Sequence, residues 1–155
     1  STATKGDVMS LSNREQETSC LLKNVGVMRF NKEHMMLASY AAEFQEMVDE
    51  LQDRPPNVDQ WHHIDSLFSR ILKVASHHFK AEEQMMLSMG YPGYEKQKNQ
   101  HDGFLNKMMK VQGEIRDRNF EFKEDFRSML WNWLLHHINE IDVEYRDFFR
   151  EKGAT

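Results

Sequence analysis

Three short breaks divide most of the sequence into four long segments. Pro55 and Pro56 interrupt the chain in DRPPNVDQW, and Gly90, Pro92 and Gly93 interrupt it in SMGYPGYEK. The third break, RDRNFEFKED, contains neither glycine nor proline and is the weakest of the three. Because proline and glycine end helices, these breaks predict four separate helices. Their expected ranges are 31–53, 58–89, 94–117 and 122–150.

Apolar residues recur at alternating steps of three and four within each segment, which is the spacing of the inward seam of a helix bundle. The four seams are His34, Leu37, Ala41, Phe44, Val48 and Leu51; Trp61, Ile64, Phe68, Ile71, Ala75, His78, Glu82, Met85 and Met89; Gln97, His101, Phe104, Met108, Val111 and Ile115; and Phe126, Leu130, Leu134, His137, Ile141, Tyr145 and Phe148. Short connections favour antiparallel neighbours. The sequence therefore predicts an all-α protein, an antiparallel up-down-up-down four-helix bundle over residues 27–151. We expect one domain, with residues 1–26 as a polar N-terminal arm and Asn57 or Asp59 capping the second helix.

Each seam contains one histidine. His34 and His101 lie near the start of their segments, whereas His78 and His137 lie in the second halves of theirs. When helix direction alternates, these four positions fall toward the same end of the bundle. A single inward histidine is more often a hydrogen-bonded core residue than a ligand. Four at one level, one from each helix, indicate a shared metal site.

Carboxylates accompany these histidines. His78 and Glu82 are four residues apart and lie on one helical face, so they can bind the same metal or neighbouring metals. Imidazole with carboxylate suits iron, manganese or zinc, and a bound metal would offset the cost of burying the carboxylate. Cys20 is the only cysteine, which argues against a thiolate zinc site and rules out an intramolecular disulfide.

The fourth segment leaves the carboxylate partner open. His136 and Glu140 are four apart, but His136 is off the seam. His137 and Asp142 are five apart, which is about 140° around an α-helix, so they would splay yet could still reach two adjacent metals. The remaining histidines and acidic residues near the seams are expected at the surface or in support of a ligand; they are His62, His63, His77, Glu83, Glu140 and Glu144.

Composition argues against some classes of binding partner. The chain has 155 residues and a net charge of −5, so it lacks the basic surface expected for binding nucleic acid or an anionic membrane. No apolar run approaches the roughly 20 residues needed to cross a bilayer. Eleven methionines suit a core that must fit around something. A single cysteine is compatible with a reducing compartment, and we expect the cytoplasm.

Four stretches, FNKEHMML, HFKAEEQMM, GYP…HDGF and WLLHHINEID, resemble the hemerythrin family, specifically its bacterial branch. The resemblance covers about residues 27–149 and implies an antiparallel four-helix bundle around two iron ions joined by an oxo or hydroxo bridge. By this resemblance His34 and His78 bind one iron and His101 and His137 the other; Glu82 and Asp142 bridge the two irons; and Trp133 and Leu134 wall the oxygen pocket.

One position departs from the family pattern. The family has a further histidine four residues before the one in HDGF, and this chain has Gln97 there. Gln97 either ligates weakly through its amide oxygen, or through a hydrogen-bonded water, or leaves an exchangeable position on the iron. These alternatives remain open.

Three functions follow. The first is reversible dioxygen binding, as a carrier or as an oxygen- or redox-sensing domain, and a sensor would be followed by an output domain after Thr155. The second is a diiron enzyme that activates dioxygen or peroxide through the position opened by Gln97. The third is a bundle whose metal site is degraded and whose role is structural or partner-binding.

Overall fold

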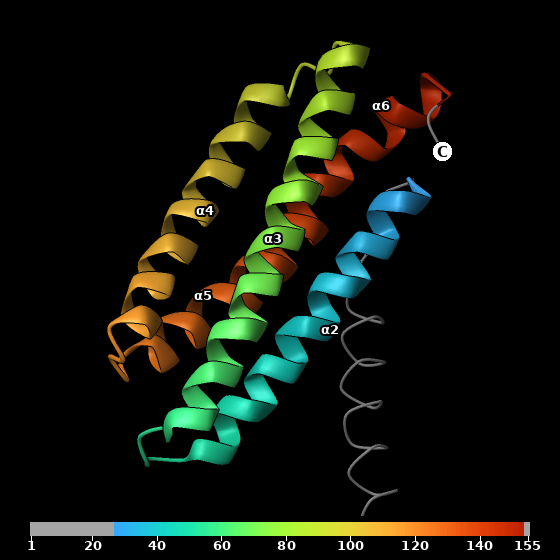
Figure 1. The fold of residues 1–155 in the computed structure, drawn as a ribbon. Coiled ribbons are helices and arrows are strands. Elements are labelled where there is room, and N and C mark those ends of the chain that lie inside the picture. Colours follow the sequence, from blue (N-terminus) through green and yellow to red (C-terminus); the bar gives the residue numbers. More distant parts are fainter. Residues whose placement is uncertain (1–26, 154–155) are drawn as a thin grey trace, which may run out of the picture.

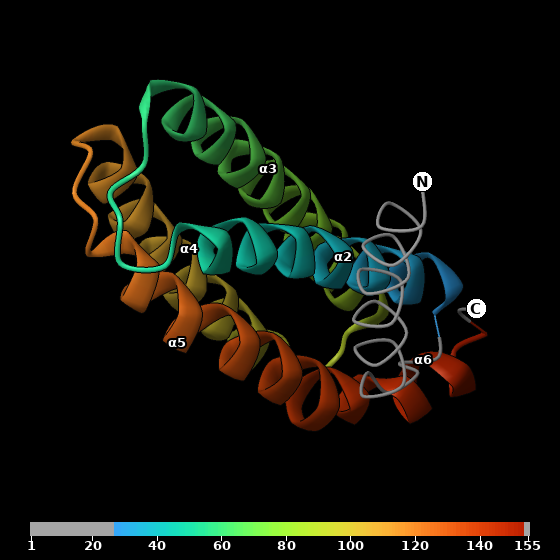
Figure 2. The same cartoon turned by 90° about the horizontal axis from the view of Figure 1, so that it is seen from below.

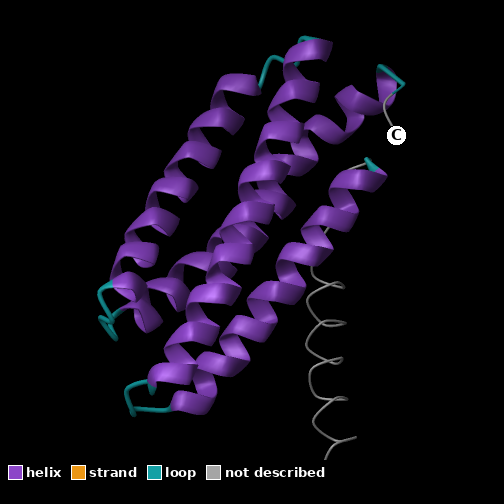
Figure 3. Cartoon of the chain, in the orientation of Figure 1, coloured by secondary structure: helices purple, strands orange, loops and turns teal. Residues whose placement is uncertain are grey.

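The computed structural model describes residues 27–153, except for the side chains of residues 128, 131–135 and 140–143. The expected N-terminal arm, with Cys20, lies outside the described residues. Within the described part every regular element is a helix, as Figure 3 shows. Each described helix is too short or too polar to cross a membrane.

The helices form a bundle, which confirms the predicted all-α fold class. In chain order they are α2 (Met28–Leu51), α3 (Val58–Met89), α4 (Tyr94–Arg116), α5 (Phe122–His136), the π-helix η1 (His137–Ile141), the 3-10 helix η2 (Asp142–Tyr145) and α6 (Arg146–Glu151). Figure 1 shows successive long helices running in opposite directions. Each packs on the next, and α5 also contacts α2, so the four long helices enclose one core (Figure 2).

The predicted breaks have clear structural causes. The Asn57 side chain accepts a 2.8 Å hydrogen bond from the Gln60 backbone, and the Gln60 side chain accepts one of 2.8 Å from the Asn57 backbone. This capping box starts α3. Gly90 ends α3 in the left-handed conformation, with φ of 68°. In the third break Arg118 takes φ of 56° without help from glycine, and its guanidinium is 2.7 Å from Asp65.

The end of the bundle far from the inward histidines is filled by aromatic rings. Phe44 and Phe126 have ring centroids 4.0 Å apart, and Phe68, Trp61 and Phe122 pack around them. Phe44 lies ten residues after His34 on α2, which is about 15 Å along the helix axis. The core therefore separates into an apolar half and a half that contains polar groups.

Three residues predicted on the seams, Met85, Met89 and Phe148, pack at the edge of the core near its polar end, and a neighbour of each kind is buried more deeply. On α3, Met86 is fully buried and Met85 and Met89 are only half-buried. After the π-helix, Phe149 is buried and Phe148 is half-buried. The π-helix contains a wider turn than an α-helix, so it shifts the phase of the residues that follow it.

Candidate metal centre

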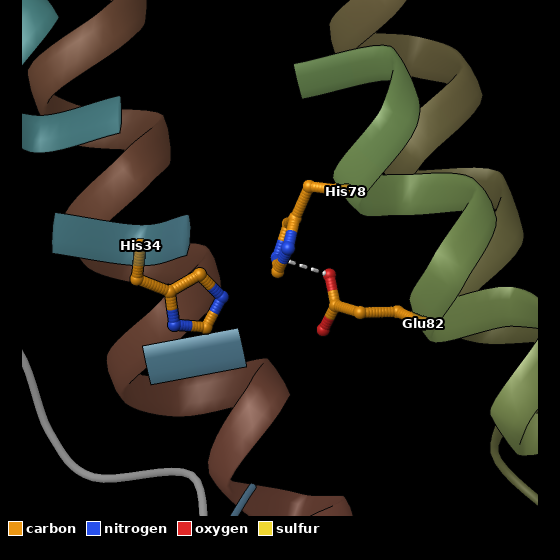
Figure 4. A group of neighbouring side chains, drawn as sticks. All are labelled: His34, His78 and Glu82. Atoms are coloured by element: carbon orange, nitrogen blue, oxygen red, sulfur yellow. Dashed lines mark ion pairs between the residues drawn. The ribbon is translucent and has the colours of Figure 1, made fainter. Parts of the chain in front are cut away.

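His34 of α2 and His78 and Glu82 of α3 meet inside the bundle. Figure 4 shows His34 facing the other two side chains across the space between the helices. The three residues are 2%, 1% and 0% exposed, respectively. Each offers a nitrogen or carboxylate oxygen, and these atoms all lie within 4.8 Å of one another. A group of this kind could hold one metal ion.

Glu82 is the centre of this group. Its Oε1 lies 2.7 Å from Nε2 of His78 and 3.7 Å from Nε2 of His101. Its Oε2 accepts a 2.6 Å hydrogen bond from the Tyr145 hydroxyl. One carboxylate oxygen therefore faces imidazoles from two helices while the other is held by a phenol.

His101 of α4 and His137, the first residue of η1, form the second half of the site. They are 0% and 1% exposed, and their ring centroids are 5.0 Å apart. The His101 ring stacks on Phe79 at 4.1 Å with an interplanar angle of 9°. Its Nδ1 is 2.8 Å from Oε2 of Glu83. Stacking and this contact orient the His101 ring with Nε2 toward Glu82.

Gln97 is also buried, at 1% exposure. It lies four residues before His101 on α4, so both side chains belong to the inward face of that helix. A buried amide therefore lies on α4 next to His101.

The π-helix changes the expected relationship between His137 and Asp142. Because π-helical hydrogen bonds join residues five apart, residues at that spacing are about one turn apart and follow one another along a face. On a regular α-helix the two side chains were expected to splay. The backbone is instead a π-helix from His137 to Ile141, just before Asp142, so the α-helical spacing does not apply to this pair.

A model of the hemerythrin HHE cation binding domain matches residues 25–147, which is most of this chain. The chain belongs to the hemerythrin family. Among similar proteins, a hemerythrin chain from Sipunculus nudus is 31% identical over 77 residues, 50% of this chain and 59% of that protein. Myohemerythrin from the same organism is 30% identical over 77 residues, 50% of this chain and 58% of that protein.

A bacterial relative is covered more fully. Bacteriohemerythrin from Clostridium acetobutylicum is 26% identical over 126 residues, 79% of this chain and 93% of that protein. By contrast, the chain spans less than two thirds of the length of the two Sipunculus proteins. No solved structure was found to match the chain.

The donor set fits the diiron cofactor of the hemerythrin family. Four imidazoles and one carboxylate lie together in the interior of the bundle, and none of these five groups is more than 2% exposed. Burial of an anionic carboxylate in such a place is costly unless a positive charge compensates it. Nitrogen and carboxylate ligands together suit iron. The buried residues described here can therefore hold the family's metal ions.

Not every residue expected from the hemerythrin resemblance can be placed. The backbones of Trp133 and Leu134 belong to α5 and that of Asp142 to η2, but their side chains lie outside the described part of the structure. The off-seam histidines lie at the surface, as expected: His62, His63, His77 and His136 are all exposed.

Sequence reasoning missed two residues that contact the candidate ligands, Tyr145 and Glu33. Tyr145 was recognised only as an apolar seam residue. Glu33 went unnoticed, although its Oε1 is 3.4 Å from Nδ1 of His78. Hydrogen bonding with His78 lowers the pKa of Glu33 and outweighs burial, which raises that pKa. Glu83, expected either in solvent or in support of a ligand, contacts His101. An acidic residue directly beside an inward histidine or glutamate was the available signal.

Proposed function

We propose that this member of the hemerythrin family holds two iron ions and binds dioxygen reversibly, as a carrier or as an oxygen- or redox-sensing domain. The observation that carries the proposal is the buried group of His34, His78 and Glu82, with His101 and His137 beside it. The matched hemerythrins and bacteriohemerythrin support the same chemistry. The bundle of residues 27–151 would be the functional unit, preceded by the arm of residues 1–26.

Residue roles follow from the positions on the four helices. His34 and His78 would hold one iron, and His101 and His137 the other. Glu82 would bridge the two, because its Oε1 faces the rings of both His78 and His101. Asp142 would be the second bridge, by resemblance to the family. When bound, the two irons would supply the electrons for a reversible reaction with dioxygen.

The protein's own part is to keep this site dry and fixed. The Phe79 ring packs against His78, His101 and His137, and the Phe30 ring meets His78 edge-on at 5.5 Å. Phe79 and Phe30 are 2% and 0% exposed. These aromatic rings exclude water from the site. Water would otherwise bring protons to the bound oxygen, and the oxidation of the site would then be irreversible.

An optical titration tests this proposal. Protein loaded anaerobically with ferrous iron should develop a visible charge-transfer band when oxygen is added, and the band should disappear when oxygen is removed. A band that rises and decays to the plain diferric spectrum would contradict reversible binding. Absence of both band and bound iron would contradict any metal-based function and favour a structural or partner-binding bundle.

Gln97 supports a second candidate, a diiron enzyme that activates dioxygen or peroxide. A buried amide at 1% exposure stands where the family pattern has a histidine. A neutral amide oxygen donates less electron density than an imidazole, and a weak ligand leaves a position where a substrate can bind. This candidate predicts catalytic turnover with peroxide and a reductant. The sensing role instead predicts that the gene's reading frame continues into an output domain.

A further inference from the structure

Two tyrosines lead from the candidate metal centre toward the surface. The Tyr145 hydroxyl contacts Oε2 of Glu82, and the residue is 0% exposed. The Tyr145 ring centroid lies 6.3 Å from that of Tyr91, at an interplanar angle of 89°. Tyr91 is 9% exposed, compared with 0% for Tyr145, so it lies nearer to solvent. The pair therefore leads from a buried candidate ligand toward the surface of the bundle.

The turn between α3 and α4 fixes the position of Tyr91. Gly90 adopts φ of 68°, and the backbone of Tyr91 bonds back to Met86 at 2.9 Å. A Cβ at Gly93 would lie 2.5 Å from Cε1 of the Tyr91 ring, so only glycine leaves room for the ring there. On its other side the ring packs against Phe148, with centroids 5.2 Å apart. These contacts therefore fix the position of the Tyr91 ring.

The rings around Tyr145 determine where an electron vacancy on it can move. Phe30 and Phe149 also pack on Tyr145, with centroids 6.3 Å and 4.6 Å away. Phenylalanine is far harder to oxidise than tyrosine. An electron vacancy on Tyr145 would therefore move to Tyr91 in preference to either phenylalanine. The hydrogen bond to Glu82 gives the phenolic proton an acceptor while Tyr145 is oxidised.

We propose that Tyr145 and Tyr91 form an electron relay between the metal centre and a small phenolic or ene-diol reductant at the surface. The relay rests on the second candidate function, the diiron enzyme, and names the source of electrons when the substrate is a peroxide. Reduction breaks the O–O bond of hydrogen peroxide and takes two electrons and two protons to give two waters. Each electron comes from Tyr145, which is restored by Tyr91. Tyr145 regains its proton from Glu82, whereas Tyr91 releases its phenolic proton to solvent as it is oxidised and then takes one hydrogen atom from the reductant. Two reductant molecules are thus oxidised to radicals per peroxide, and solvent supplies the two protons that the waters need.

Four tyrosines in the chain allow a matched test. The iron-loaded full chain and the variants Tyr145→Phe and Tyr91→Phe are mixed with hydrogen peroxide, frozen rapidly and examined by electron paramagnetic resonance. Tyr40→Phe and Tyr94→Phe serve as controls, because neither tyrosine contributes to the pathway. We expect a tyrosyl radical in the wild type and both controls, and its loss in Tyr145→Phe. In Tyr91→Phe the radical should persist several-fold longer when the reductant is present.

A second readout locates the radical without relying on turnover. A nitroso spin trap followed by peptide mass spectrometry should label Tyr91 in the wild type and should lose that label in Tyr145→Phe. Tyr91→Phe leaves the Glu82 contact intact, so it carries the test even if Tyr145→Phe folds poorly or loses iron.

The outcomes distinguish a failure of the relay from a failure of the proposed diiron function. Peroxide consumption with no tyrosyl radical, with a radical on tryptophan instead, or with equal radical decay in wild type and Tyr91→Phe, overturns the relay alone. Failure to bind iron or to react with either dioxygen or peroxide overturns both proposals.

Discussion

Tyr145 and Glu82 are far apart in the chain, yet the tyrosine hydroxyl donates a 2.6 Å hydrogen bond to Oε2 of the glutamate. Both side chains are 0% exposed. The bond ties the helical segment after η1 to α3 at the level of the candidate metal centre. A hydrogen bond to a buried charged group contributes more to stability than one between neutral groups.

Tyr145→Phe should therefore destabilise the iron-free protein, by about 1.5–3 kcal/mol, because it removes the hydroxyl and leaves the Glu82 oxygen without this donor. Urea denaturation measures the change. Tyr40→Phe, on the half-buried side of α2, is the matched control and should have a smaller effect. Equal stability of Tyr145→Phe and wild type would mean that the bond does not anchor Glu82.

Removal of the metal should lower the melting temperature. A ligand that binds only the folded state stabilises it by about 4 kcal/mol when its concentration is a thousand times its dissociation constant. Chelation followed by differential scanning calorimetry measures this contribution. His34→Ala and His78→Ala should reduce the iron content, whereas exposed His62→Ala should not. An unchanged melting temperature after chelation would favour the structural role.

Gln97→His places an imidazole at a 1% exposed position where the resemblance to the hemerythrin family leads us to expect one. If Gln97 leaves a position open to substrate, the substitution should lower peroxide turnover and lengthen the lifetime of the oxygen-dependent band. Stopped-flow spectroscopy measures both. Gln112→His, on the half-buried surface of the same helix, controls for adding a histidine to α4. Unchanged turnover in Gln97→His would remove the basis of the enzyme hypothesis.

Glu114 should make stability depend on pH. Burial, followed by hydrogen bonding with Asp125 of α5, raises the pKa of Glu114 above its ordinary value of 4.5. Nearby charges act in both directions: Lys110 lowers this pKa, and Glu121 adds to the rise. The protonated form is therefore favoured in the folded state. Its stabilising contribution is complete below pH 4.5 and is lost as the pH rises through the folded-state pKa.

Glu114→Gln mimics the protonated side chain. The variant should melt higher than wild type at pH 7 and close to wild type at pH 4, as followed by circular dichroism. Glu124→Gln removes the same charge from an exposed position on α5 and should not reproduce the pH-dependent difference. A melting temperature for Glu114→Gln below that of wild type at pH 7 would contradict this account.

Truncation of a ring in the aromatic half of the core should lower the free energy of unfolding strongly without releasing the metal. Phe126→Ala removes a 1% exposed ring that packs on Phe44 at 4.0 Å, and such truncations cost about 3–5 kcal/mol. Urea denaturation should show this loss, and iron content per folded molecule should stay unchanged because the site lies at the other end of the bundle. Leu87→Ala, at a 59% exposed position, should have little effect on either quantity.

The sequence predicted the ends of the helices well where local chemistry determines them. The expected range 58–89 coincides with α3, because Asn57 forms the capping box and Gly90 takes the left-handed conformation. It predicted the burial of His34, His78, Glu82, His101 and His137, because the bundle seam has a regular period. Local rules were enough for these features.

The π-helix and the bond from Tyr145 to Glu82 were not predicted. The π-helix at His137–Ile141 interrupts a segment whose apolar period looked regular, and it moves Phe149 into the core in place of Phe148. The five-residue spacing of His137 and Asp142 was the one sign of it. The bond from Tyr145 to Glu82 joins two helices, so no spacing within one helix could have shown it.

The π-helix is equivalent to an α-helix into which one residue has been inserted. Deleting a single codon between His137 and Asp142 would let the segment return to an uninterrupted α-helix. Every residue beyond the deletion would then turn by about 100° about the helix axis. Tyr145 would leave Glu82, and Phe149 would leave the core. The reading frame of this family member should therefore accept a substitution at half-buried Asn139, away from the candidate ligand His137, far more readily than a change in the length of η1.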